Sequence, residues 1–111
     1  MSSPSLMEAR KSARADKHRQ DDALRALHER ALALMSDQQR SAPVMARAQA
    51  AISKWESAKT CSPFYVEEWR RILANPVEEL RQRVLRPDAP NGVALMYNTP
   101  FGFLLREPAT A

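Results

Sequence analysis

The segment from Thr60 to Leu73, TCSPFYVEEWRRIL, constrains the fold of this chain more than any other stretch. Ser62 is a favourable helix N-cap, because its hydroxyl can accept a hydrogen bond from a backbone N–H of the first helical turn. Pro63 follows at the first helical position, where its missing N–H costs nothing. The segment therefore predicts a helix at the centre of a small helical core. The apolar residues that recur at helical spacing on its buried face are Phe64, Tyr65, Trp69, Ile72 and Leu73.

The amino-acid composition indicates an all-α fold of about one domain. Only two glycines occur among 111 residues, and hydrophobic residues make up 44%, as is typical of a globular chain rich in helix. From Leu6 to about Gln39 the chain contains neither proline nor glycine, which predicts one long helix. We expect a compact bundle of three shorter helices to follow, and then an irregular aromatic C-terminal tail.

The long helix divides into two halves of different character. Residues 6–22 are polar nearly all round, whereas apolar residues repeat every three or four positions from Leu24 onward. Since an unpacked helix is marginal in water, the polar half is either a solvated extension or a segment that docks on a partner. The apolar half packs on the other helices of this chain, or it pairs with a partner or a second copy. We therefore divide the chain into an extension (1–22), a helical domain (23–105) and a disordered tail (106–111).

Two further helices are predicted around the central one. A helix capped by Ser41 and ending near Lys59 places Val44, Ala48, Ala51, Ile52 and Trp55 on one face. It should form an αα-hairpin with the next helix. Asn75 and Pro76 repeat the cap-then-proline pattern and predict a fourth helix that ends near Leu85.

The aromatic tail allows two interpretations. Residues 91–105 form either a short β-hairpin or a short helix capped by Asn91 and followed by irregular chain. We favour the helix, because an isolated two-stranded hairpin is weak and the rest of the chain is helical. Trp55 and Trp69 are expected in the core, while Tyr97, Phe101 and Phe103 suit either the core or a recognition segment.

Basic residues offer a candidate nucleic-acid surface. The net charge is +4, and Arg10, Arg14 and Lys17 fall at i, i+4 and i+7 with Lys11 beside them, so that one face of the first helix carries a basic stripe. Glu8 and Asp16 interrupt it. A second candidate basic group comprises Arg70, Arg71, Arg81, Arg83 and Arg86.

Motifs for catalysis or metal binding are missing from the sequence. One cysteine allows neither an internal disulfide nor a multi-cysteine zinc site. The two histidines, His18 and His28, lie on the predicted first helix, where nothing brings them to Cys61 as a base. We therefore expect no enzyme, no cofactor, no metal and no small-molecule substrate. No apolar signal segment and no run of ~20 apolar residues occurs, so we also expect a cytoplasmic protein without a membrane span.

These observations favour a small non-enzymatic interaction protein, such as a regulator, adaptor or inhibitor. It would bind a protein partner or a second copy through its first helix, with Leu24, Leu27, Leu34 and Met35 as the candidate contact residues. The alternative is a nucleic-acid-binding regulatory protein that uses Arg10, Lys11, Arg14 and Lys17. An enzyme centred on Cys61 is the third hypothesis.

Overall fold

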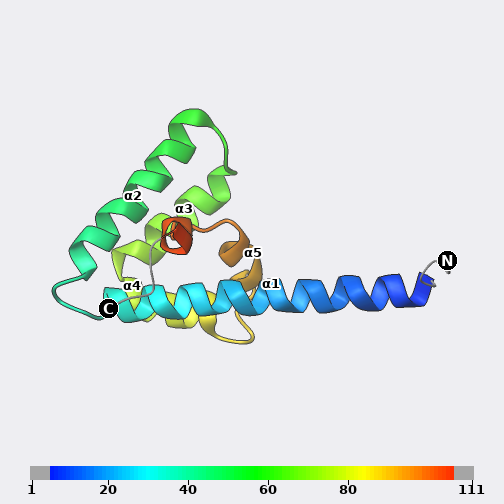
Figure 1. Cartoon of the computed structure of the whole chain (residues 1–111). Coiled ribbons are helices and arrows are strands. Elements are labelled where there is room, and N and C mark those ends of the chain that lie inside the picture. Colours follow the sequence, from blue (N-terminus) through cyan, green and yellow to red (C-terminus); the bar gives the residue numbers. More distant parts are fainter. Residues whose placement is uncertain (1–5, 107–111) are drawn as a thin grey trace.

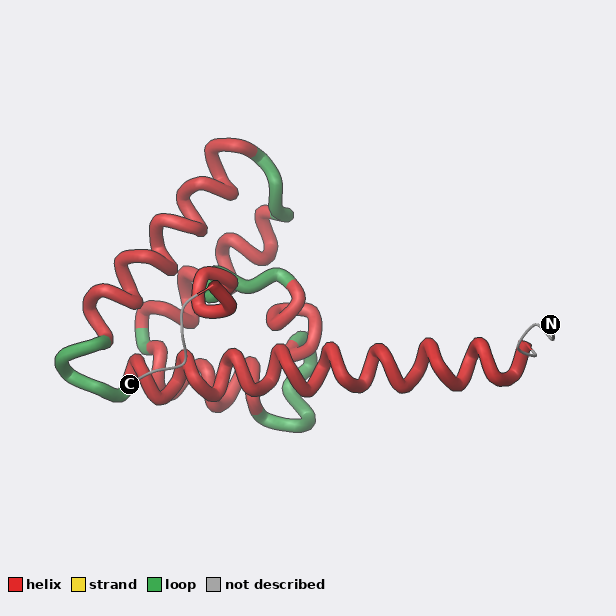
Figure 2. The backbone as a smooth tube through the Cα atoms, viewed as in Figure 1, coloured by secondary structure: helices red, strands yellow, loops and turns green. Residues whose placement is uncertain are grey.

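The computed structural model describes residues 6–106, which are mostly helical and contain no strand (Figure 1). The predicted all-α fold with a long first helix is confirmed. The sequence predictions for residues 1–5 and 107–111 lie outside the described residues. Short loops join the helices (Figure 2). In chain order the elements are α1 (Leu6–Met35), α2 (Ser41–Ala58), α3 (Pro63–Ala74), α4 (Pro76–Glu79), the π-helix η1 (Leu80–Leu85), α5 (Gly92–Tyr97) and the 3-10 helix η2 (Gly102–Arg106).

The long helix α1 is the base on which the other helices pack. Its C-terminal half contacts α2, α4, η1, α5 and η2, while its N-terminal half extends past the body of the molecule (Figure 1). Arg25 donates a hydrogen bond to the carbonyl of Leu85 at 2.8 Å, and Arg30 donates one to the carbonyl of Leu104 at 2.9 Å. Two arginines of α1 therefore satisfy backbone carbonyls of η1 and η2.

The core is centred on α3, as predicted. Val66, Trp69, Ile72 and Leu73 are its buried residues, and Trp69 donates its indole N–H to the carbonyl of Asn98 at 2.6 Å. Every other element except α4 adds buried apolar side chains, and so does the turn between α5 and η2, which holds Phe101. These residues are Leu27, Ala31, Met35, Ala48, Ile52, Leu80, Val84, Leu95, Met96, Phe101 and Leu104. Trp55 and Tyr65 pack half-buried against this core, whereas Phe64 is exposed.

The predicted αα-hairpin is formed by α2 and α3. Lys59 ends α2 in the left-handed conformation with φ 54°, and the side chain of Ser62 accepts a hydrogen bond from the N–H of Phe64 at 3.3 Å. Both ends of this tight connection are thus specified locally, as the sequence indicated. The beginning of α2 differs from the prediction: Arg40 occupies the cap position, without a side-chain cap hydrogen bond.

The predicted fourth helix is interrupted. One turn of α4 passes into the π-helix η1, where Leu80 and Val84 are buried. Asn75 stands at the cap position of α4, as predicted, but its side chain makes no cap hydrogen bond. A π-helix widens the turn by one residue and re-aims the side chains that follow. Here both buried residues belong to the core that α1 and α5 share with η1.

The helical interpretation of residues 91–105 is confirmed. Asn91 precedes α5, again without a side-chain cap hydrogen bond, and the chain then turns into η2. Phe101 is buried and Phe103 is half-buried, so the aromatic tail belongs to the body of the molecule. Arg106, predicted as the first residue of a disordered tail, is the last residue of η2.

Candidate interaction surfaces

The most exposed element is the first half of α1. Every side chain from residue 6 to residue 20 is exposed, and we call this segment the α1 arm. At about 1.5 Å per residue it projects roughly 22 Å from the body (Figure 1). Leu6 and Met7, near its outer end, are 67% and 79% exposed.

The cations of the predicted stripe form a row along the arm. Arg10, Arg14 and Lys17 are spaced by four and three residues, and the same alternation continues through Asp21 to the buried His28. Residues so spaced lie on one side of a helix, so the basic row follows the side of α1 that packs into the core further along. Within residues 6–106, no ion pair involves a cation of this row or the neighbouring Lys11, whereas Arg19 pairs with Asp16.

An aromatic contact marks the inner end of the row. Tyr97 on α5 donates its hydroxyl to Asp21 at 2.6 Å, and this hydrogen bond raises the pKa of Tyr97. The ring of Tyr97 and the side chain of Val93, one helical turn earlier, are exposed. The body therefore presents an apolar edge of α5 at the point where the arm begins.

The apolar seam of α1 faces the chain's own core. Leu27 and Met35 are 5% and 6% exposed, and Leu24 and Leu34 are half-buried against the same cluster. Of the two arrangements considered from the sequence, the structure has the one in which this seam packs on the other helices. A partner could touch only the half-exposed edges of Leu24 and Leu34 in this conformation.

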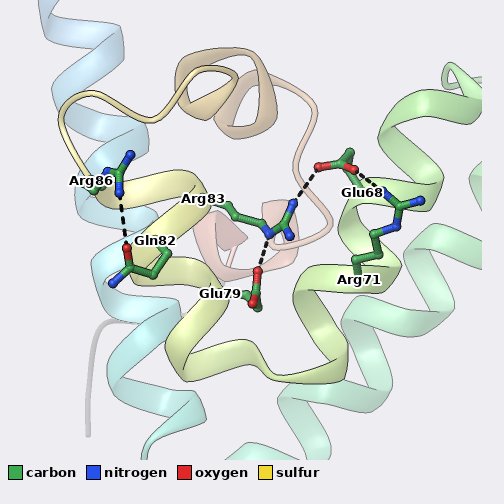
Figure 3. Close-up of polar contacts among 6 residues, drawn as sticks. All are labelled: Glu68, Arg71, Glu79, Gln82, Arg83 and Arg86. Atoms are coloured by element: carbon green, nitrogen blue, oxygen red, sulfur yellow. Dashed lines mark hydrogen bonds and ion pairs between the residues drawn. The ribbon is translucent and has the colours of Figure 1, made fainter.

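The second basic group is largely neutralised by carboxylates. Figure 3 shows Arg71 and Arg83 on either side of Glu68, at 3.0 and 3.4 Å, with Arg83 also paired to Glu79. The hydrogen bond to Glu79 raises the pKa of Arg83. These arginines and carboxylates bridge α3, α4 and η1 at the surface. The group is therefore charge-balanced and makes a poor anion site.

Two more arginines of this group are paired as well. Arg70 holds Glu56 through two hydrogen bonds of 2.8 and 2.9 Å, which lower the pKa of Glu56 and join α3 to α2. Arg86 pairs with Asp88 at 2.7 Å and donates to Gln82 at 3.4 Å (Figure 3). Arg81 alone of the five has no ion pair with a described residue.

Cys61 lies in the α2–α3 connection beside a surface hollow of about 660 Å³. The charged residues that line the hollow are Glu56, Lys59, Glu67 and Arg70. His18 is on the α1 arm and His28 is in the core, so neither histidine reaches this thiol. The arrangement gives Cys61 no imidazole base.

His28 is the one buried polar side chain of the described core, and sequence reasoning assigned it no role. Its Nδ1 lies 2.7 Å from the carbonyl of Leu24, which can only accept, so Nδ1 carries the proton. Its Nε2 then accepts from the hydroxyl of Thr99 at 2.7 Å, and that oxygen accepts from the N–H of Phe101 at 3.1 Å. Burial lowers the pKa of His28, and the hydrogen bond to Leu24 only partly opposes this.

The surroundings of His28 indicate a structural role. The ring stacks on Trp69 with centroids 5.9 Å apart and meets the ring of Phe101 edge-on at 6.0 Å. It thereby joins α1 to α3 and to the segment after α5. A signal for this position exists in the sequence, because His28 continues the spacing of four and three residues between Leu24 and Ala31.

Residues 6–106 contain no group of three or more histidine, cysteine, aspartate or glutamate side chains placed to hold a metal ion. Nor does any helix in this range have the length and apolar character needed to cross a membrane. Comparison of the chain with protein families, with curated proteins and with solved structures finds no match.

Proposed function

We propose that this chain is a small non-enzymatic interaction protein of the cytoplasm whose α1 arm docks on an acidic surface of a partner protein. The observation that carries the proposal is the exposure of every side chain in residues 6–20 of a helix whose second half is held by the core. A polar helix without packing is marginal in water. A partner that packs along the arm would supply the stabilisation that the body does not.

The chemistry of the arm suggests what such a partner presents. Arg10, Arg14 and Lys17 lie in one row without an ion pair to the described residues, and Met7 extends the row by one further turn. A groove edged with carboxylates and open to an apolar side chain at one end would complement this face, as in other helix-in-groove complexes. Long-range attraction between the basic arm and the acidic groove would mainly raise the rate of association.

Two observations support the non-enzymatic and cytoplasmic parts of the proposal. The hollow at Cys61 lacks a histidine among its lining residues, which favours binding over thiol catalysis. A single cysteine without a partner suits a reducing compartment, which supports the cytoplasm. The body would anchor the inner end of the arm, so that the protein acts as a regulator, adaptor or inhibitor by occupying its partner's surface.

The test is capture of partners from native lysate by the tagged full-length chain, with and without nuclease, followed by titration of the purified partner. We expect one protein to survive nuclease treatment, with an affinity lowered by Arg14→Gln. The matched control, Arg81→Gln, also removes one exposed cation and should leave the affinity as it is. A partner that binds Ala13→Pro, in which the arm helix is broken, as tightly as the unchanged chain would exclude the arm as the contact.

A second candidate function is nucleic-acid binding through the same arm. It is supported by Arg10, Lys11, Arg14 and Lys17, none of which is paired with a described carboxylate. Three phosphate contacts on duplex DNA would give log K a slope of about −2.7 against log salt concentration. A salt-independent affinity, or capture that survives nuclease unchanged, would remove this candidate.

A further inference from the structure

The α1 arm and helix α5 meet at an open corner of the molecule. The basic row of the arm, Arg10, Arg14 and Lys17, lies on the side of α1 that packs into the core further along. The body therefore stands on the same side of α1 as these cations, and α5 contacts α1 where the arm leaves the body (Figure 1). We call this concave surface the arm–α5 corner.

The wall of the corner is the apolar edge of α5. Val93 and Tyr97 are spaced by four residues, so they share one face of the helix, and they are 51% and 45% exposed. The hydroxyl of Tyr97 donates a hydrogen bond to Asp21 of α1, which holds this face beside the inner end of the basic row. The corner thus combines a cationic floor with an apolar wall.

Charge is ordered along the floor of the corner. The cations occupy its outer part: at about 1.5 Å per residue, Lys17 lies about 6 Å and Arg10 roughly 16 Å from the level of Asp21. The carboxylate of Asp21 stands at the inner end, where it repels another anion. A complementary surface therefore carries carboxylates opposite the three cations and an apolar side chain next to the wall.

We propose that the arm–α5 corner binds an acidic amphipathic helix of the partner protein, with carboxylates on the basic row and a large apolar residue against Val93 and Tyr97. Side chains three and four residues apart line one face of a helix, so carboxylates at that spacing match the row one to one. Three turns of helix cover the roughly 16 Å from Arg10 to the wall. This inference rests on the proposed function, because it names the element by which the partner meets the arm.

Other occupants fit the corner less well. A second copy of this chain offers few free carboxylates, because Glu56, Glu68, Glu79 and Asp88 are each paired with arginines. The backbone of a nucleic-acid duplex meets the cations but brings no apolar group to α5. An anionic membrane is flat on this scale and cannot follow both sides of a concave corner.

The test uses fluorescence anisotropy of labelled synthetic helices of about 18 residues with the full-length chain at low salt. The first peptide carries three glutamates spaced by four and three residues and a leucine pair at one end. We expect it to bind, and replacing both leucines by serine should weaken binding roughly 10-fold. A third peptide of the same composition, with the leucine pair between the glutamates, should bind as weakly as the serine peptide.

Variants of the chain test the floor and the wall separately. Val93→Ser should weaken binding of the leucine peptide roughly 3- to 10-fold and leave binding of the serine peptide unchanged, because the lost contact is apolar. Arg14→Gln should weaken binding of both peptides. The matched control, Phe64→Ser, removes an exposed apolar side chain at the start of α3 and should leave both affinities unchanged. Thermal unfolding of each variant separates a lost contact from lost folding.

Several outcomes would overturn the proposal. These are no binding of the leucine peptide, equal binding of the serine peptide, or binding of Val93→Ser as tight as that of the unchanged chain. Sensitivity to Arg14→Gln without sensitivity to Val93→Ser would remove the corner and leave docking by the arm in place. An affinity that Arg14→Gln does not change would count against the arm itself, and so against the proposed function as well. Tighter binding of a DNA duplex than of the leucine peptide would assign the basic row to nucleic acid.

Discussion

At the residue scale, His28 shows how one buried side chain can join distant parts of a chain. Its imidazole links the Leu24 carbonyl within α1 to the hydroxyl of Thr99, 71 residues further on. In the neutral tautomer that carries the proton on Nδ1, both ring nitrogens are satisfied. A buried polar group whose hydrogen bonds are all made specifies one arrangement of its neighbours, because any other leaves it unpaired.

The first prediction concerns pH. Because the folded pKa of His28 lies below that of the unfolded chain, the unfolded state takes up a proton first as the pH falls. The contribution of His28 to stability is therefore complete above about pH 6.5 and declines below it, with a slope of at most about 1.4 kcal/mol per pH unit until the folded pKa is reached. Urea unfolding at a series of pH values between 8 and 5 measures this decline in the free energy of unfolding.

Two substitutions separate His28 from other titrating groups. His28→Gln should flatten the decline of the unfolding free energy between about pH 6.5 and 5. The matched control is His18→Gln, which removes an exposed histidine of the arm and leaves the core untouched. If the free energy of unfolding of His28→Gln declined by the same amount, another titrating group would be responsible for the pH dependence.

The second prediction concerns the hydroxyl of Thr99. Thr99→Val keeps the shape of the side chain but leaves both the Nε2 of His28 and the N–H of Phe101 without this partner. We expect a loss of about 1–3 kcal/mol in the free energy of unfolding. Thr99→Ser retains the hydroxyl and should lose much less. Equal stability of the valine and serine variants, measured by urea unfolding, would show that the hydrogen bonds contribute nothing.

At the element scale, the contact between η1 and α5 depends on the absence of a side chain. A Cβ added at Gly92 would stand 2.7 Å from the backbone carbonyl oxygen of Val84 and 3.2 Å from the Cβ of Ala89. Neither atom belongs to a flexible side-chain end that could move aside. Gly92 therefore lets the first turn of α5 approach the π-helix closely enough to bury Leu95 and Met96.

The third prediction compares the two glycines of the chain. Gly92→Ala should lower the free energy of unfolding by about 1–3 kcal/mol, because either η1 or α5 must shift. Gly102 has open space where a Cβ would be placed and no positive φ, so Gly102→Ala should be neutral or stabilise by up to about 1 kcal/mol. Thermal or urea unfolding of both variants decides the point. Equal changes in the free energy of unfolding of the two variants would mean that η1 and α5 can move apart at Gly92 without cost.

At the scale of the whole molecule, the two halves of α1 differ in how they are stabilised. From Leu24 onward it is part of the cooperative core, whereas the arm from residue 6 to residue 20 touches little beyond itself. Regions with few buried contacts open locally without global unfolding. The arm should therefore fray on its own, which leaves it available to a partner.

The fourth prediction tests this division with two prolines. Ala13→Pro should reduce the far-ultraviolet helix signal but change the free energy of unfolding by less than about 0.5 kcal/mol, because the arm lies outside the core. Ala26→Pro, at an exposed position in the packed half, should cost about 3 kcal/mol or more. Comparable losses from the two substitutions would show that the arm folds together with the body.

Much of the architecture could be predicted from local signals. The Ser62–Pro63 start of α3, the uninterrupted first helix and the apolar spacing of α2 each depend on neighbouring residues, and the structure agrees with all three. The α1 arm was also recognisable, because residues without apolar periodicity cannot be buried. Caps at Asn75 and Asn91 were predicted with the same reasoning and form no side-chain hydrogen bond. Capping competes with tertiary packing, which local sequence patterns do not reveal.

By itself, then, the sequence determined which segments are helical, where α3 begins and which half of α1 stays in water, since backbone propensity and periodicity act over a few residues. Only the tertiary structure decided which residues far apart in the sequence contact one another. It paired His28 with Thr99, neutralised Arg70, Arg71, Arg83 and Arg86, and placed Tyr97 beside Asp21 at the base of the arm. The reason is physical: whether a charge is paired or a ring is covered depends on which distant element packs beside it, and helical spacing carries no information about that neighbour.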